Sequence, residues 1–268
     1  MDYLLHPSNI KLDISKFGLG PLPPNSIKKW ASDKEYKIFS EYNKDPIKRD
    51  LLNKLSWTED SIKYRSNDYG YRMEEDFSSI LGNECVVYLG CSITFGVGLN
   101  IEDTWGWKHS HMRGLRYVNL SWPGSGVETF YRMLKIWSSN LNIKKVYTLG
   151  SFFGRREILS STSMSTSWRD TEKTNVMILG HWYKDIERST LYSQISDEDE
   201  LKISHIRGWD SIIGICHSNN IELLILNFND RKKISKFLDN NARDLMHTGP
   251  RWHTAVANLP DSAWVRLA

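Results

Sequence analysis

The feature that most constrains the fold of this chain is a repeated alternation of short apolar runs with helical stretches. The runs, rich in branched and aromatic residues, stand at 85–89, 117–120, 145–149 and 221–226. Plausible helices lie between them at 104–112, 127–140 and 206–219. Such runs are typical of strands buried on both faces, and their alternation with helices predicts a parallel sheet covered on both sides. We therefore expect an α/β fold, with three α/β/α layers around a parallel, flavodoxin-like sheet.

The first 80 residues do not share this pattern. An early cluster of glycine and proline is followed by mixed charges and aromatic residues without strand alternation. Helices are expected at 32–42 and at 46–55, where Pro46 suits a first helical turn. We predict two parts: a 1–80 N-terminal extension that packs on the core, and an 81–268 α/β domain.

A second irregular region interrupts the α/β rhythm at about 155–205. Residues 159–174 are rich in serine and threonine, and an acidic run follows at 196–200. This insertion is far longer than the usual connection of about four to six residues. Two interpretations are open: a lid or substrate loop over the strand ends, and a solvated surface excursion.

Charge and cysteine content narrow the classes of partner. The 268 residues include 35 basic and 32 acidic side chains, and the net charge of +3 is too small to indicate nucleic acid. Three cysteines without CxxC spacing argue against a disulfide framework and a structural zinc site, and favour a reducing compartment. The N-terminus lacks the apolar segment of a signal peptide, and no stretch reaches the ~20 apolar residues of a membrane helix. We predict a cytoplasmic protein with no membrane partner.

A candidate nucleophile follows the first apolar run, where parallel sheets bind their ligands. Ser92 stands in a glycine-flanked turn, Leu89-Gly-Cys-Ser-Ile-Thr-Phe-Gly96. A serine so placed can attack a carbonyl when a base takes its proton and backbone N–H groups stabilise the oxyanion. Serine is equally an ordinary turn or helix-cap residue. The turn differs from the GxSxG elbow, because position 94 is threonine.

Two further segments offer partners for such a serine. Asp244 and His247 stand three apart near the C-terminus, so the carboxylate can fix the imidazole tautomer and leave Nε2 as a base. A local Asp/His turn is one alternative, and metal binding by His247 and His253 is another, although no carboxylate or cysteine stands at a known ligand spacing. The glycines of Asn119-Leu-Ser-Trp-Pro-Gly124-Ser-Gly126 let a backbone N–H point into the site, and a plain tight turn explains them equally.

In order and position these segments resemble the SGNH (GDSL-type) hydrolase family over residues 84–258, roughly two thirds of the chain. The family's blocks are GDS after the first strand, a downstream N…G block, GxND after a later strand, and DxxH near the C-terminus. Tyr64-Arg-Ser-Asn-Asp-Tyr-Gly-Tyr-Arg72 is similar to the NxxGxR segment that precedes the first block in members with an N-terminal extension. The motifs GCSxTFGxG and DxxHxGPxxH are similar to those of SGNH-like proteins from phages and environmental bacteria.

The resemblance implies a role for each matching residue. Ser92 would be the nucleophile, His247 the base and Asp244 its orienter. The N–H groups of Ser92 and Gly124 would form the oxyanion hole. No cofactor and no metal are implied.

The chain departs from the family at two positions. Cys91 replaces the aspartate of GDS, and Phe152 stands where GxND has its oxyanion asparagine. Loss of one oxyanion donor typically lowers the rate by a factor on the order of 10²–10³. The candidate replacements just beyond this block and after the last predicted strand are Arg155, Arg156, Asn227 and Asn229.

The resemblance implies a serine esterase that acts through an ester on Ser92. Trp122 and Trp252 adjoin the site loops, and flat aromatic rings are a usual platform for sugars, so an O-acetyl group on a carbohydrate is the expected substrate. Core packing is the alternative role for both rings. Two rival functions are an SGNH-fold acyltransferase and a catalytically impaired binding or structural module. A virion component that trims host polysaccharide would follow by analogy.

Overall fold

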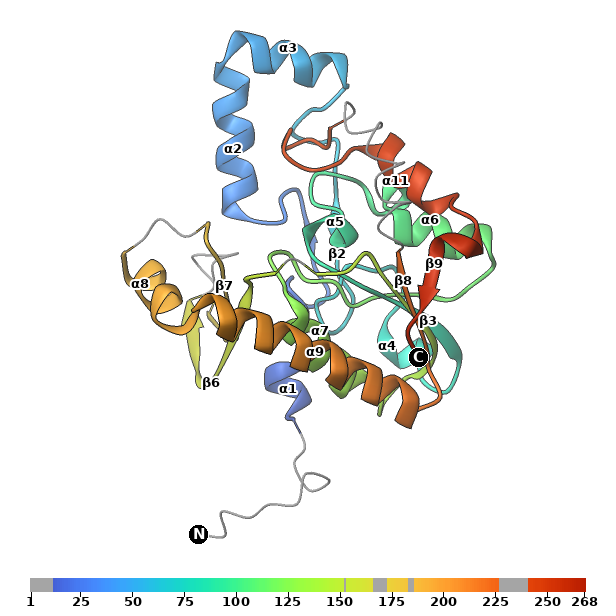
Figure 1. Ribbon diagram of the computed structural model, residues 1–268. Coiled ribbons are helices and arrows are strands. Elements are labelled where there is room, and N and C mark those ends of the chain that lie inside the picture. Colours follow the sequence, from blue (N-terminus) through green and yellow to red (C-terminus); the bar gives the residue numbers. More distant parts are fainter. Residues whose placement is uncertain (1–11, 152, 166–172, 183–185, 227–240) are drawn as a thin grey trace.

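The computed structural model describes residues 12–151, 153–165, 173–182, 186–226 and 241–268 (Figure 1). Its largest sheet has five strands in the order β4-β3-β5-β8-β9. These are β3 (Glu84–Leu89), β4 (Tyr117–Asn119), β5 (Asn142–Thr148), β8 (Glu222–Leu226) and β9 (Trp264–Arg266). The first four in chain order pair in parallel, and β9 pairs antiparallel with β8. The predicted α/β fold around a mostly parallel sheet is confirmed.

Helices cover this sheet in two pairs. One pair is α7 (Val127–Trp137) with α9 (Glu198–Ser218), and the other is α6 (Trp105–Met112) with α11 (Pro250–Ala257). Figure 1 shows the α6–α11 pair above strands β3, β8 and β9 and the α7–α9 pair below them. Tyr88 of β3 points toward α6, with its ring 5.2 Å from that of Trp105. The neighbouring Val87 faces the other layer, because successive strand residues alternate between faces. Both strand residues are fully buried, which explains why the run is apolar throughout.

The segment before the sheet holds short helices and a small antiparallel ribbon. The helices expected at 32–42 and 46–55 are α2 (Asp33–Lys44) and α3 (Pro46–Lys54). Asp45 caps α3, because its side chain accepts the N–H groups of Ile47 and Lys48. Tyr71 fastens this segment to the core, because its hydroxyl accepts a hydrogen bond from Trp137 Nε1 at 2.9 Å. The elements are α1 (Ile14–Phe17), β1 (Ile27–Lys28), α2 (Asp33–Lys44), α3 (Pro46–Lys54), β2 (Tyr64–Arg65) and α4 (Phe77–Ile80).

The insertion forms a hairpin and two helices where the sequence indicated irregular chain. Strands β6 (Arg156–Ser165) and β7 (Lys173–Leu179) pair antiparallel, and α8 (Ile186–Ile195) follows. The acidic run opens α9 rather than lying in a loop. Asp197 accepts the N–H groups of Asp199 and Glu200, and acids in a first turn interact favourably with the helix dipole. The remaining elements are α5 (Ser92–Phe95) and two short 3₁₀ helices, η2 (Ile101–Asp103) and η4 (Asp261–Ala263).

None of the helices in the described part of the chain combines the length and the apolar character required to cross a membrane. Its three cysteines, Cys85, Cys91 and Cys216, are all buried free thiols.

Candidate active site

Ser92 begins the single helical turn α5, directly after β3. Cys91 precedes the turn, and Gly96 ends it with φ +81°, a left-handed conformation that favours glycine. The chain reverses there, so that the N–H groups of Gly96 and Val97 both donate to the Ser92 carbonyl. Ser92 is half-buried at the carboxyl end of its strand, where the sequence pattern expects it.

Asp244 and His247 form a close pair in the loop before α11. Nδ1 of His247 lies 2.5 Å from Asp244 Oδ2, and the N–H groups of Met246 and His247 donate to Asp244 Oδ1. Burial alone would raise the pKa of Asp244, but the hydrogen bonds from the His247 ring and from the two backbone N–H groups outweigh it, and the pKa is lowered. An ionised Asp244 keeps the ring proton on Nδ1. Nε2 of His247 is thereby left as a base.

Backbone contacts join the Ser92 turn to both other predicted segments. On one side, the Gly90 carbonyl accepts the Trp122 N–H at 2.9 Å and the Ser125 hydroxyl at 3.0 Å. On the other side, the Gly98 carbonyl accepts the Arg243 N–H at 2.9 Å. A Cβ on Gly98 would lie only 3.0 Å from that nitrogen, so this approach requires glycine. The three segments that the sequence singled out therefore meet at one edge of the sheet.

The hydrogen bond expected between the predicted nucleophile and the predicted base is not made in this structure. Among the described residues, no hydrogen bond joins Ser92 Oγ to His247 Nε2. The side chain of His247 is 21% exposed, so the ring borders solvent beside the paired carboxylate. Hydrogen bonds of this kind are often long in a free enzyme and tighten when substrate binds.

The predicted oxyanion turn has an arginine beside it. Gly124 adopts φ +82°. Nη1 of Arg155 donates to the Ser125 carbonyl at 2.9 Å, and its guanidinium lies 5.2 Å from the centre of the Trp182 ring. Arg156 is directed elsewhere, to Glu128 at 2.9 Å. The other positions considered for this role, Phe152, Asn227 and Asn229, lie outside the described residues.

The sugar platform expected from the sequence needs correction. Trp122 and Trp252 are only 5% and 4% exposed and belong to the main hydrophobic core. Rings so deeply buried cannot stack on a sugar, so their role is packing. The half-buried Trp182 lies nearer the site, with its Cζ2 3.6 Å from where a Cβ of Gly124 would stand. In the sequence, Trp182 is distinguished only by its position shortly after the apolar run 176–179 of the insertion.

His253 anchors the loop that carries the predicted base, His247. Its Nδ1 accepts the Trp105 N–H at 2.9 Å, so the ring proton lies on Nε2, which donates to Thr248 at 3.1 Å. His247 is thus bound by Asp244, and His253 by Trp105 and Thr248. In the described ranges, no three His, Cys, Asp or Glu side chains gather as metal ligands do.

Stability should fall in mild acid because of two buried histidines. Burial lowers the pKa of His109 to about 4 and that of His253 to about 3, against an ordinary value of 6.5. Below about pH 6.5 the unfolded chain takes up protons that the folded state refuses. The contribution of these two histidines to the free energy of unfolding should therefore be fully present above that pH. It should fall by up to roughly 1.4 kcal/mol per pH unit for each histidine as the pH drops further.

Urea denaturation between about pH 7 and pH 5 measures this slope, in a range above the usual carboxylate titrations. His109→Phe should make the slope shallower even if it lowers stability at neutral pH. An equal slope in the wild type and in His109→Phe would contradict the assignment of the His109 ring as neutral in the folded protein.

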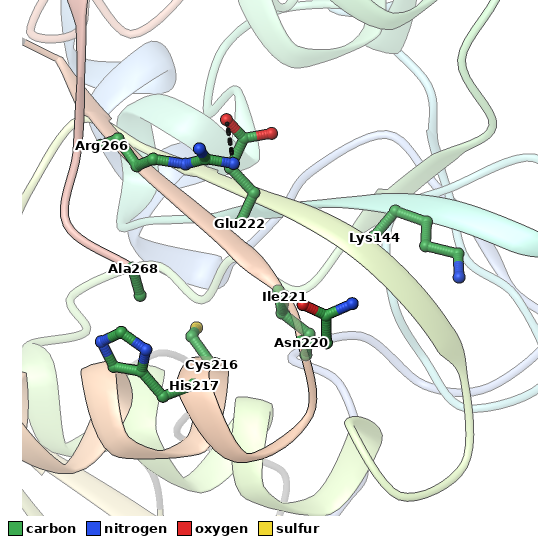
Figure 2. Close-up of a pocket in the computed structure, with 8 residues that line it drawn as sticks. All are labelled: Lys144, Cys216, His217, Asn220, Ile221, Glu222, Arg266 and Ala268. Carbon is green, nitrogen blue, oxygen red and sulfur yellow. Dashed lines mark ion pairs between the residues drawn. The ribbon is translucent and has the colours of Figure 1, made fainter.

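A separate cavity lies at the opposite edge of the sheet. Its volume is about 280 Å³, and Figure 2 shows its lining residues at the start of β5 and β8 and at the end of α9. Glu222 and Arg266 form an ion pair of 3.0 Å at its wall. None of the candidate site residues lines this cavity, so it is not the site that the strand ends predict. The lining residues are Lys144, Cys216, His217, Asn220, Ile221, Glu222, Arg266 and Ala268.

No protein-family model matches the chain, and no curated protein matches it.

Proposed function

We propose that the protein is a serine esterase that hydrolyses a small acyl ester. The observation that carries this proposal is the Asp244–His247 pair, on a loop bonded directly to the Ser92 turn. In the first step His247 Nε2 takes the Ser92 proton while Oγ attacks the ester carbonyl carbon. The N–H groups of Ser92 and Gly124 receive the oxyanion.

The cycle closes with three further proton transfers through the same imidazole. His247 returns its proton to the leaving alcohol, which departs and leaves the acyl group on Ser92. A water molecule then gives a proton to Nε2 and attacks the acyl carbon. As this second intermediate collapses, the acid leaves and His247 gives its proton back to Ser92 Oγ, which restores the hydroxyl and the neutral imidazole. Asp244 stabilises the imidazolium in both halves without taking a proton itself.

We propose an acetyl-sized acyl group on a carbohydrate as the substrate. Trp182 and Ile178 both lie within 4 Å of the position that a Cβ of Gly124 would take, which limits the room beside the oxyanion turn. The half-buried Trp182 ring supplies an apolar surface there of the kind that sugars stack on. An acyltransferase would use the same triad and pass the acyl group to a hydroxyl instead of water.

Hydrolysis of p-nitrophenyl acetate tests the esterase directly. The wild-type protein should turn the ester over, and Ser92→Ala should reduce the rate to background. His217→Ala is a matched control, because that histidine lines the cavity at the opposite sheet edge. Its rate should stay at the wild-type value. Turnover that survives in Ser92→Ala would remove the proposed nucleophile.

Arg155 is the group we propose in place of the oxyanion asparagine. Arg155→Met should lower kcat by about 10²-fold with little change in KM, because a donor that acts on developing charge contributes mainly in the transition state. Arg156→Met removes the neighbouring guanidinium, which is bound to Glu128, and should leave kcat within about threefold. Equal losses in the two variants would assign Arg155 a structural role only.

One rival function has a specific observation in its favour. The missing Ser92–His247 hydrogen bond, together with Phe152 in place of the asparagine, fits a catalytically impaired binding or structural module. Such a protein would show no turnover of the acetate ester and no difference between wild type and Ser92→Ala.

We also propose a reducing compartment such as the cytoplasm, because the three thiols are buried and unpaired in the described structure.

A further inference from the structure

A fully buried ionic cluster joins the N-terminal segment to the loop of the catalytic base. Its members are Glu35 of α2, Tyr64 of β2 and Arg243, each no more than 3% exposed. Glu35 Oε1 accepts hydrogen bonds from Arg243 Nη2 at 2.9 Å and from the Tyr64 hydroxyl at 3.0 Å. Its second oxygen accepts the Ala31 N–H at 2.7 Å. Both carboxylate oxygens are thus engaged.

The same cluster reaches the nucleophile turn. The Tyr64 hydroxyl accepts the Gly98 N–H at 2.7 Å, and the Gly98 carbonyl is the group that binds the Arg243 N–H. Arg72 lies 4.3 Å from the centre of the Tyr64 ring and caps the end of the turn that Ser92 begins. Its guanidinium donates to the carbonyls of Phe95, Gly96 and Leu99.

On the other side, Arg243 immediately precedes Asp244 in the chain. Its guanidinium also donates to the carbonyls of Glu59 at 3.0 Å and Lys29 at 2.5 Å, and it lies 3.9 Å from the centre of the Trp30 ring. Three separate parts of the N-terminal segment, at 29–30, 35 and 59, therefore hold this one side chain. These contacts anchor the residue that precedes Asp244 in the chain.

We infer that the buried cluster of Glu35, Tyr64 and Arg243 is a built-in positioning element of the active site, which sets the separation of Ser92 and His247. Glu35, Tyr64 and Arg243 are positioning residues, because none of them touches the reacting atoms. A buried ion pair gains little stability over an apolar contact of similar volume, whereas its directional bonds fix geometry. Displacement of a reacting group by about 1 Å can lower a rate by about 10²-fold. This inference rests on the proposed esterase function.

Two tyrosines of the same segment give a matched test. Tyr64 and Tyr71 are both fully buried, and replacement by phenylalanine removes one hydroxyl from each. The Tyr71 hydroxyl binds Gly18 and Trp137, which belong to neither catalytic loop. Tyr64→Phe should lower kcat about tenfold or more at a nearly unchanged KM, whereas Tyr71→Phe should lose thermal stability with kcat within about twofold. Equal kcat losses in the two variants would overturn the inference.

A second measurement separates this inference from the esterase proposal. Proton NMR detects the downfield Nδ1–H of His247 bound to Asp244, and His247→Ala assigns the resonance by its loss. The resonance should weaken or shift in Tyr64→Phe and persist in Tyr71→Phe. This outcome supports the positioning element even if the wild-type protein hydrolyses no ester. A resonance unchanged in Tyr64→Phe overturns it, whatever the activity.

Discussion

Asp244→Asn should lower kcat for ester hydrolysis by a factor on the order of 10⁴ while the protein stays folded. The asparagine side-chain oxygen can still accept the N–H groups of Met246 and His247, which keeps the loop in shape. Its amide nitrogen would face His247 Nδ1 as a donor and stabilise the tautomer with the proton on Nε2. That tautomer cannot take a proton from Ser92.

Steady-state kinetics with p-nitrophenyl acetate measure the effect, and circular dichroism confirms the fold. Asp261→Asn is a matched control, because Asp261 is 92% exposed and its ion-pair partner, at 3.6 Å, is Arg113 rather than a candidate site residue. Its kcat should equal that of the wild type. An Asp244→Asn variant that retains more than about a tenth of wild-type kcat would show that the carboxylate does not set the tautomer.

Arg243→Met should lower the free energy of unfolding by about 3–5 kcal/mol, the usual result of removing one partner from a buried ion pair. Glu35 would be left as a buried carboxylate without its cation, and the carbonyls of Lys29 and Glu59 would each lose a donor. The double variant Glu35→Met, Arg243→Met should recover part of the loss, because it removes both charges from the interior.

Urea denaturation gives the free energies, and Arg266→Met supplies the comparison. The Arg266–Glu222 pair spans 3.0 Å, but the arginine side chain is 66% exposed, so its removal should cost about 0–1 kcal/mol. A loss below about 1 kcal/mol for Arg243→Met would mean that the buried pair does not fasten the N-terminal segment to the site.

Strands β3 and β8 could be predicted from the sequence because each is a nearly continuous apolar run. Glu84–Leu89 and Glu222–Leu226 each lie within a residue of the predicted run at either end. Strand β9 escaped prediction because it is three residues long, and only the first of the three, Trp264, is buried. The β6–β7 hairpin escaped because serine and threonine dilute its apolar pattern, although Val176 and Ile178 are buried with strand alternation.

The candidate site was predictable to the extent that its residues follow strands. Ser92 and Gly124 come directly after strands, and Asp244 and His247 lie within four residues of one another. Glu35 contacts Arg243 across 208 residues, and no local pattern predicts a pairing of that kind. Trp122 was misassigned because adjacency to a site loop does not show whether a ring turns toward the site or the core.

Labelling with a fluorophosphonate tests the central claim most directly, because the reagent captures a serine only when a base activates it and an oxyanion hole receives the charge. The expected result is a single phosphonyl adduct that peptide mass spectrometry places on Ser92. This adduct should be absent from His247→Ala and should form at the wild-type rate in His217→Ala. An adduct on another serine, or none in the folded wild-type protein, would contradict the assignment of Ser92 as an activated nucleophile.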